Sequence, residues 1–276
     1  MKEFVVQDLG LIEYETAWKL QDEYAAEIAQ EKRPPTLLLL EHPHVYTFGR
    51  KGNAKNLLWG EEQLKQKGIS VHWVDRGGDV TYHGPGQLVG YPLFPLGKIS
   101  TTSHLNSVSL SGSEGSLPLK VRDSSVAKNS PSERHEVFEM SANNNLPKVD
   151  YVGYVRKLEK ALIEALARLS VVTGQRSGLT GVWVQADVNS RCARCKPEDR
   201  QKPAKIAAIG VKVDARGVSR HGFALNVDPD MEYWDGIIAC GLSEPVISLA
   251  DLLAPVPSME LVREEIVNAF RKVFAD

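Results

Sequence analysis

The densest group of ligand-binding residues in this sequence is the twelve-residue stretch Arg76-Gly77-Gly78-Asp79-Val80-Thr81-Tyr82-His83-Gly84-Pro85-Gly86-Gln87. Glycine lets backbone N–H groups approach a ligand closely, because no Cβ stands in the way. Arg76 offers a planar set of donors for an anionic or carbonyl oxygen, and His83 can donate, accept or titrate near neutral pH. Apolar runs flank the stretch, so a plain hairpin is the alternative. Hairpin loops are usually only about two to five residues long, and the length and polarity here favour a binding loop.

Cys240 is a candidate nucleophile at the end of an apolar run, between Ala239 and Gly241. A buried structural thiol is the alternative, because free cysteine is among the most buried residue types. A free thiol with a pKa near about 8.5 is only a few per cent thiolate at neutral pH, and a nearby ammonium group favours the thiolate. Lys205 could supply that ammonium group, although a solvated lysine at the start of a strand is its ordinary interpretation.

The run that follows Lys205 contains unusually small side chains. Ala207, Ala208 and Gly210 stand among Ile206 and Ile209, and small residues on a strand leave open space above the sheet. The alkyl chain of a ligand or a packed helix could fill that space. The predicted partner strand, Val218–Val227, carries a second polar group in His221-Gly222-Phe223.

The remaining candidate motifs are weak. Cys192 and Cys195 have CxxC spacing but lack a second metal-binding pair or the strand-to-helix context of a redox motif, so we interpret them as incidental loop cysteines. His42 and His44 flank Pro43 with poor metal-ligand spacing, which favours hydrogen bonding or a pocket wall. No phosphate-binding fingerprint and no Ser-His-Asp nucleophile elbow is present.

Composition limits the class of protein. The 276 residues include 42% hydrophobic and 25% charged residues with a net charge of −2, which is ordinary for a globular protein and gives no strong field toward nucleic acid or anionic lipid. No apolar run approaches about eighteen residues, so we expect no membrane span. Three cysteines do not make a disulfide framework, and a reducing compartment is the natural expectation.

The pattern of elements predicts an α+β protein with a mainly antiparallel or mixed sheet and flanking helices. Helices are expected over Ile12–Lys32, Glu61–Lys67, Asp150–Leu169 and Met259–Phe274. Strands are expected over Phe4–Val6, Thr36–Glu41, Val45–Gly49, Ile69–Val74, Leu88–Leu93, Gly181–Val184, Lys205–Val213 and Val218–Val227. Two polar segments, at about 98–148 and 189–204, are predicted to be flexible insertions in one catalytic domain that spans residues 1–276.

Four motifs in series resemble the lipoyl(octanoyl) transferase family. They are Arg76–Gln87, Lys205-Ile206-Ala207-Ala208-Ile209-Gly210-Val211, His221-Gly222-Phe223-Ala224-Leu225-Asn226-Val227 and Cys240-Gly241, with further similarity at Glu41-His42-Pro43 and Gly181-Val182-Trp183. The resemblance covers nearly the whole chain apart from the two insertions. It implies the fold of the biotin/lipoate protein ligase catalytic domain.

The resemblance also implies an acyltransferase that moves an octanoyl group from octanoyl-acyl carrier protein to a lysine of a lipoyl domain, as the first step of endogenous lipoate biosynthesis. Cys240 would form the thioester intermediate and Lys205 would lower its pKa. The implied substrate-binding residues are Arg76, Gly77, Gly78, Asp79, Val80, Thr81, Tyr82, His83, Ala208, Ile209, Gly210, His221, Gly222 and Phe223. No metal and no cofactor is expected.

The expected partners are octanoyl-acyl carrier protein, the lipoyl domains of 2-oxoacid dehydrogenase complexes and the glycine cleavage H protein. We expect a cytoplasmic location, or the mitochondrial matrix if a leader is missing. Three alternatives stay open: an ATP-dependent lipoate or biotin ligase of the same fold, an octanoyl amidotransferase between lipoyl domains, and a non-catalytic scaffold that binds metal through Cys192 and Cys195. Cys240 argues against the ligase, because a mechanism through an acyl-adenylate needs no thiol.

Overall fold

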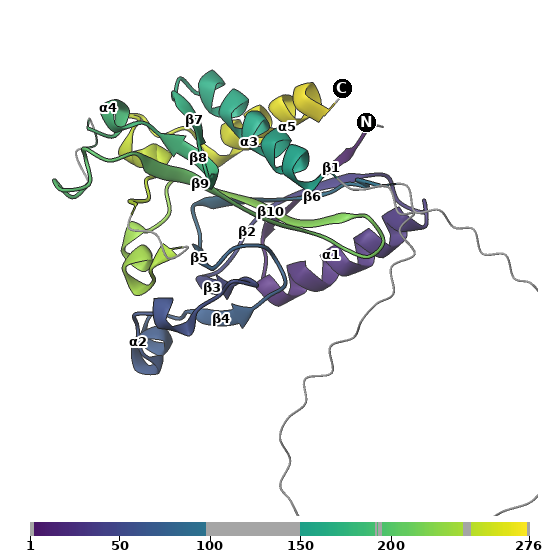
Figure 1. Ribbon diagram of the computed structural model, residues 1–276, viewed down its shortest axis with the longest axis horizontal. Coiled ribbons are helices and arrows are strands. Elements are labelled where there is room, and N and C mark those ends of the chain that lie inside the picture. The colour runs from purple at the N-terminus through teal and green to yellow at the C-terminus, as the bar shows by residue number, and fades with distance from the viewer. Residues whose placement is uncertain (1–2, 98–149, 191, 193–194, 240–243, 275–276) are drawn as a thin grey trace, which may run out of the picture. The chain divides into compact units, whose positions relative to one another are not determined.

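The computed structural model describes residues 3–97, 150–190, 192, 195–239 and 244–274. These residues belong to one compact unit of two β-sheets and their covering helices (Figure 1). The insertion predicted at 98–148 lies outside the described residues.

The larger sheet has seven strands and contributes one wall of the cavity that is described below. Its strand order is β1-β2-β6-β10-β9-β8-β7. The strands are β1 (Val5–Leu11), β2 (Thr36–Glu41), β6 (Gln87–Leu93), β7 (Thr173–Arg176), β8 (Leu179–Val184), β9 (Ala204–Val213) and β10 (Ser219–Asn226). β1 pairs with β2 in parallel, and every other neighbouring pair in this sheet is antiparallel. The sheet is therefore mixed but mainly antiparallel, as the sequence predicts.

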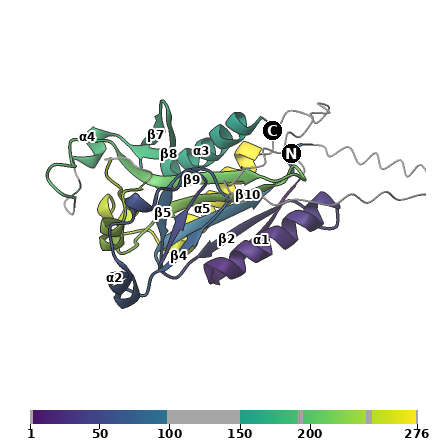
Figure 2. The same ribbon diagram turned by 60° about the horizontal axis from the view of Figure 1, so that its bottom comes forward.

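Helices cover both faces of this sheet, as the two views in Figures 1 and 2 show. One face packs against α3 (Tyr151–Arg168) and α5 (Met259–Phe274) through a large hydrophobic cluster. The other face packs against α1 (Tyr14–Ala29) through a smaller cluster. The amphipathic patterns predicted these three long helices because each buries one apolar stripe against the sheet. The α+β class is confirmed.

Short helices connect the remaining elements. Among the described residues they are α2 (Glu61–Gln66), α4 (Ala186–Asn189) and the 3₁₀ segments η1 (Ala54–Asn56), η2 (Met231–Gly236) and η4 (Leu249–Asp251). The sequence predicts α2 but none of these 3₁₀ segments, which are too short to show a period.

The smaller sheet has the strand order β4-β3-β5 and corrects one prediction. Its strands are β3 (Val45–Phe48), β4 (Ser70–Trp73) and β5 (Val80–His83). The stretch 76–87 is therefore not a single loop, because its middle is a buried strand that pairs antiparallel with β3. The alternative of a plain hairpin is also wrong, because β4 and β6 belong to different sheets.

The second insertion contains ordered contacts where the sequence predicted a flexible segment. The buried Asn189 side chain donates to the carbonyl oxygens of Asp199 and Lys202, each at 2.8 Å. Cys192 is only 1% exposed, belongs to the large hydrophobic cluster and forms a disulfide with Cys195. The interpretation of these two residues as incidental loop cysteines is therefore wrong. Spacing alone gave no sign that Cys192 packs in the core.

In the parts of the chain that the structure describes, no helix combines the length and the apolar character that crossing a membrane requires. No cluster of three or more histidine, cysteine, aspartate or glutamate side chains that could hold a metal ion is found there either.

Candidate active site

A cavity lies where the small sheet and the loop before β5 meet the larger sheet. One wall comes from Arg76–Gly78, Thr81 and His83, and the other from Ala208–Gly210 and His221–Phe223. The structure thus brings together eleven of the fourteen predicted substrate-binding residues, although they come from three distant parts of the chain. The cavity volume is about 50 Å³, which is room for a few water molecules.

The geometry of β5 explains why Val80 and Tyr82, two of the three remaining predicted residues, lie outside the cavity. Side chains alternate between the two faces of a strand. Thr81 and His83 therefore face the cavity, while Val80 and Tyr82 are fully buried in the hydrophobic cluster of the small sheet. Asp79 instead accepts hydrogen bonds from the backbone N–H groups of Asn53 and Val80, at 3.0 and 2.7 Å, and fixes the turn before η1.

Arg76 holds the glycine-rich loop against β3. Its guanidinium group donates from Nε and Nη2 to Thr47 Oγ1, at 3.3 and 2.9 Å, and from Nη2 to the Thr47 carbonyl oxygen. Nη1 donates to the Gly77 carbonyl oxygen at 2.9 Å. These contacts use the same planar donors of Arg76 that the sequence predicts to bind a ligand. Arg76 is therefore a clamp for the loop as well as part of the cavity wall.

His83 is the first member of a chain of buried hydrogen bonds. Gln87 Nε2 donates to Asn226 Oδ1 at 2.8 Å and to the Tyr82 carbonyl oxygen at 3.1 Å, so its Oε1 accepts from His83 Nδ1 at 2.7 Å. Burial holds the pKa of His83 well below its usual range. The neutral ring therefore carries its proton on Nδ1, and Nε2 is an acceptor.

Asn226 extends this chain toward Lys205. Its Nδ2 donates to the Ile247 carbonyl oxygen at 3.1 Å. The Ile247 N–H in turn donates to the Lys205 carbonyl oxygen at 3.0 Å. The chain thus connects the cavity histidine with the backbone of the predicted catalytic lysine.

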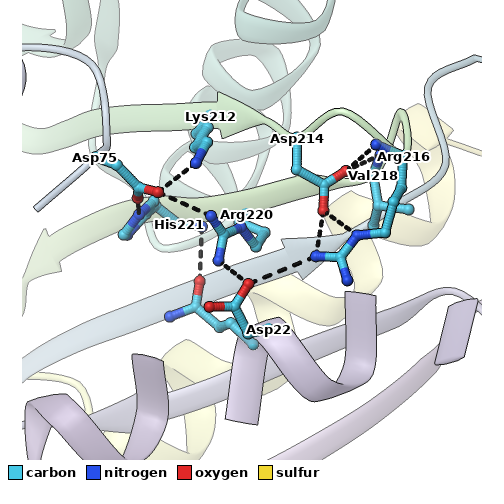
Figure 3. A network of polar contacts seen from close by, with 9 residues as sticks. Asp22, Asp75, Lys212, Asp214, Arg216, Val218, Arg220 and His221 are labelled. Carbon is cyan, nitrogen blue, oxygen red and sulfur yellow. Dashed lines mark hydrogen bonds and ion pairs between the residues drawn. The ribbon is translucent and has the colours of Figure 1, made fainter. Parts of the chain in front are cut away.

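His221 is held by contacts from two other elements. Its backbone N–H donates to Gln21 Oε1 at 2.7 Å, and its Nε2 lies 2.8 Å from Asp75 Oδ1. Asp75 also receives hydrogen bonds from Lys212 and Arg220, as Figure 3 shows. The hydrogen bond from His221 is the main cause of a pKa for Asp75 well below its usual range, and burial lowers the pKa of His221.

Sequence reasoning missed several aromatic and polar residues at this site. Tyr14 and Tyr91 line the cavity, and His42 lies behind them, with its Nε2 2.8 Å from the Tyr91 hydroxyl. Burial lowers the pKa of His42 to about 4, so the ring is neutral at physiological pH. The role expected for His42, hydrogen bonding or a pocket wall, matches this position. Tyr14 gives no local signal, because it reads as an ordinary core residue of α1.

Lys205 lies on β9 beside the segment that precedes η4. Its backbone N–H donates to the Pro245 carbonyl oxygen at 2.8 Å, in a parallel bridge with Val246. Its Nζ lies 4.7 Å from the ring centre of Trp183, and the guanidinium carbon of Arg176 also lies 4.7 Å from that ring. A fully buried indole with two cations close to its ring restrains the lysine side chain. The predicted nucleophile, Cys240, lies outside the described residues.

A glycine next to Lys205 makes room for its side chain. A Cβ on Gly181 would lie 2.7 Å from the Ala207 carbonyl oxygen and 3.4 Å from Lys205 Cε. The Gly181 N–H donates to the fully buried Glu159 Oε1 at 3.0 Å, and Arg156 pairs with the same carboxylate at 2.6 Å. Glu159 on α3 thus fixes the strand that supports Lys205.

A family model matches this arrangement over most of the chain. The model is described as the lipoyl protein ligase A/B catalytic domain, and it matches residues 13–109 and 137–271. The chain belongs to this family. The matched residues include every wall of the cavity, and the resemblance inferred from the four motifs is confirmed.

Curated relatives narrow the family to transferases. A protein of *Chloroflexus aurantiacus* named octanoyltransferase is 36% identical over 276 residues, which cover 100% of this chain and 96% of that protein. An octanoyltransferase of *Cytophaga hutchinsonii* is 32% identical, covering 99% of this chain and 93% of that protein. The chain is therefore an acyltransferase of the lipoate ligase and transferase family, and octanoyl transfer in protein lipoylation is the activity that these relatives support.

Solved structures of family members agree on the fold. A putative lipoate protein ligase from *T. acidophilum* superposes with a TM-score of 0.57 at 14% identity, covering 99% of this chain and 85% of that one. A lipoate-protein ligase A bound with ATP superposes with a TM-score of 0.54 at 13% identity, covering 99% and 85% of the two chains. At these identities the likeness concerns the fold alone.

Proposed function

We propose that this family member takes an octanoyl group from octanoyl-acyl carrier protein and attaches it to the lysine of a lipoyl domain, through a thioester on Cys240. Full-length similarity to octanoyltransferases supports the transfer. The observation that carries the proposal is the cavity, which is lined by the small residues Ala208 and Gly210 of β9, the strand that also carries Lys205.

The proposed chemistry has two balanced steps. In the first, the Cys240 thiolate attacks the thioester carbonyl, the new S–C bond forms, the bond to the carrier's sulfur breaks, and the leaving thiolate takes a proton from Lys205. In the second, the neutral amine of the acceptor lysine attacks the enzyme thioester, an amide forms, the Cys240 thiolate is released and the proton lost by the amine returns to Lys205. One thioester replaces another of nearly equal energy in the first step, so the reaction needs no ATP and no cofactor.

Lys205 is proposed to act on the thiol and on the incoming amine. An ammonium group beside the sulfur favours the thiolate, and a lysine that has lost its proton can take one from the attacking amine. The backbone hydrogen bonds that Lys205 donates to Pro245 and accepts from Ile247 support this role, because Pro245 follows Cys240 by only five residues. The cation–π contact with Trp183 holds the side chain close to its strand.

The cavity is the proposed binding site for a medium-length acyl group. Each buried methylene contributes about 0.8 kcal/mol, so the length of the cavity sets chain selectivity. At about 50 Å³ the cavity is smaller than an eight-carbon tail requires. We therefore expect side chains in the wall to move apart when the tail enters. The proposed partners are octanoyl-acyl carrier protein and the lipoyl domains of 2-oxoacid dehydrogenase complexes and of glycine cleavage H protein, in the bacterial cytoplasm.

The deciding experiment mixes the protein with octanoyl-acyl carrier protein in the absence of ATP and measures the intact mass. We expect a gain of one octanoyl group that hydroxylamine removes, that Cys240→Ser abolishes and that a lipoyl domain discharges. A transfer that requires ATP and survives Cys240→Ser would instead show a ligase. If the protein takes up the octanoyl group only from an octanoylated lipoyl domain, and not from the carrier protein, it is an amidotransferase.

A matched pair of lysine variants tests the second residue. Lys205→Met should raise the pKa of the reactive thiol and slow acylation, while Lys202→Met should change neither, because Lys202 is exposed and pairs with Asp199 at 2.8 Å. The pH profile of iodoacetamide labelling reports the thiol directly. An unchanged profile in Lys205→Met would refute the role of Lys205.

A further inference from the structure

His221 has a backbone conformation that turns its ring to the other side of the sheet. Residues 221 and 223 of one strand should point to the same face. The Phe223 ring lies 5.5 Å from the Phe270 ring of α5, yet the His221 ring lies 6.4 Å from the rings of Trp18 in α1 and Tyr91, on the opposite face. The φ angle of His221 is +56°, in the left-handed region that a non-glycine residue adopts at a cost.

Hydrogen bonds at two points hold this conformation. Gln21 accepts from the backbone N–H of His221, and Asp75 accepts from Nε2. Asp75 is itself held by Lys212 and Arg220, so its carboxylate cannot easily turn away (Figure 3). An ionised carboxylate only accepts, which fixes the ring's proton on Nε2 and fixes the plane of the ring.

The position of His221 along the hairpin makes it the far wall of the cavity. In the β9–β10 register Ala224 faces Ala208, Gly222 faces Gly210 and His221 faces Val211. His221 is thus the cavity-lining residue of β10 that lies furthest along the hairpin from Lys205. On β9 the cavity wall begins at Ala208, and the partner of His221, Val211, lies three residues further on, which corresponds to about 10 Å along a strand.

We propose that Asp75 is a positioning residue that fixes the His221 ring as the far wall of the acyl cavity and thereby limits the length of the acyl group that the enzyme accepts. This inference rests on the proposed function, because it assigns the cavity to the acyl chain. A tail that enters from the side of Lys205 ends at the imidazole ring, and a longer tail must leave methylene groups exposed. Each methylene that gains burial raises affinity about fourfold.

Four variants separate this role from a general effect on folding. His221→Gly removes the ring, and glycine tolerates the left-handed backbone. Asp75→Ala releases the ring, and the double variant tests whether Asp75 acts through His221. Asp22→Ala is the matched control, because Asp22 pairs with Arg220 and Arg216 of the same network without a contact to His221.

The measured quantity is the ratio of kcat/KM for decanoyl-acyl carrier protein to kcat/KM for octanoyl-acyl carrier protein. We expect His221→Gly to raise the ratio about fifteenfold, since two methylenes gain burial. Asp75→Ala should raise it at least threefold, Asp22→Ala should leave it unchanged, and the double variant should match His221→Gly alone. A purely structural Asp75 would lower the melting temperature without moving the ratio, which would overturn the proposal.

Binding of free octanoate and decanoate, measured by calorimetry on the same proteins, distinguishes a failure of the proposed transferase function from a failure of the far-wall proposal. If the wild-type protein fails to transfer octanoate from the carrier but the binding ratio shifts as expected, the proposed function is wrong and the far wall is right. If transfer occurs and neither ratio moves in His221→Gly, the far wall is wrong and the transferase stands. If only His221→Gly moves the ratio, the positioning role of Asp75 is refuted.

Discussion

Arg76 fixes its loop to Thr47 and also lines the cavity, and substitution of Arg76 separates these two roles. Arg76 is 7% exposed, and the acceptors that its guanidinium group binds include the Thr47 hydroxyl, the Thr47 carbonyl and the Gly77 carbonyl. The single ammonium group of a lysine cannot reach acceptors on both sides. Arg76→Lys should therefore lose at least two hydrogen bonds to a charged group.

The expected magnitude follows from those contacts. A hydrogen bond to a charged group contributes about 1.5–3 kcal/mol, so Arg76→Lys should lower the free energy of unfolding by about 3 kcal/mol. Thr47→Val removes only the hydroxyl and should cost about 1.5 kcal/mol. Because both changes break the same contact, the double variant should cost about 1–1.5 kcal/mol less than the sum of the two.

Urea unfolding at neutral pH measures all three variants, with Arg50→Lys as the matched control. Arg50 is exposed, so its substitution should stay within about 0.5 kcal/mol. Additive losses, to within about 0.3 kcal/mol, would refute the clamp. In that case Arg76 would serve the ligand alone, and Arg76→Lys would raise KM without changing stability.

Three further predictions concern acid, thiols and close packing. Burial lowers the pKa of His42 to about 4. The unfolded chain therefore binds more protons than the folded one, and the free energy of unfolding should fall as pH drops from about 6.5 to about 4. Asp75, with a pKa below its usual range, should add a further loss below about pH 4, visible in urea unfolding at stepped pH. Of three cysteines two share the disulfide, so one thiol per chain should label in unreduced, unfolded protein, and three after reduction. Gly222→Ala should prevent folding or cost more than about 3 kcal/mol, because its Cβ would lie 2.0 Å from the backbone oxygen of Gly90, whereas Gly178→Ala meets open space and should cost about 1 kcal/mol by the same assay.

Local patterns predicted those parts of the site that lie on regular elements. The small residues of β9 and the turn that follows them predict a strand and its antiparallel partner, β10. The terminal helix begins at Met259 and ends at Phe274, as predicted. The family motifs added eleven residues that line the cavity, because these residues fall within three short motifs of the chain.

One error came from a signal that was present in the sequence. Val80-Thr81-Tyr82-His83 alternates core and cavity side chains and is rich in β-branched and aromatic residues, which are typical of a strand. The surrounding glycines and Pro85 favoured a single loop and outweighed that alternation. The consequence was that Asp79, Val80 and Tyr82 were grouped with the cavity residues, although their side chains fix the turn and fill the core of the small sheet.

Other features have no local signal at all. Asp75 and His221 are 146 residues apart in sequence, and Lys205 meets Pro245 only because a later segment returns beside β9. Propensity describes a residue in its own element, whereas these contacts depend on how separate elements cross. The left-handed backbone of His221 also has no reliable signal in the sequence, because only a small minority of histidines adopt it even though histidine is enriched there.

The strain at His221 and the clamp at Arg76 suggest why this cavity is formed by two sheets. A ligand pocket on one sheet could widen by sliding a single loop. Here the loop of Arg76 is fixed to the small sheet through Thr47, while His221 is fixed to α1 through Gln21 and to the segment before Arg76 through Asp75. Each wall therefore restrains the other. Loosening either contact should change which acyl groups fit before it changes whether the chain folds, and this order of effects is what a wall that selects chain length requires.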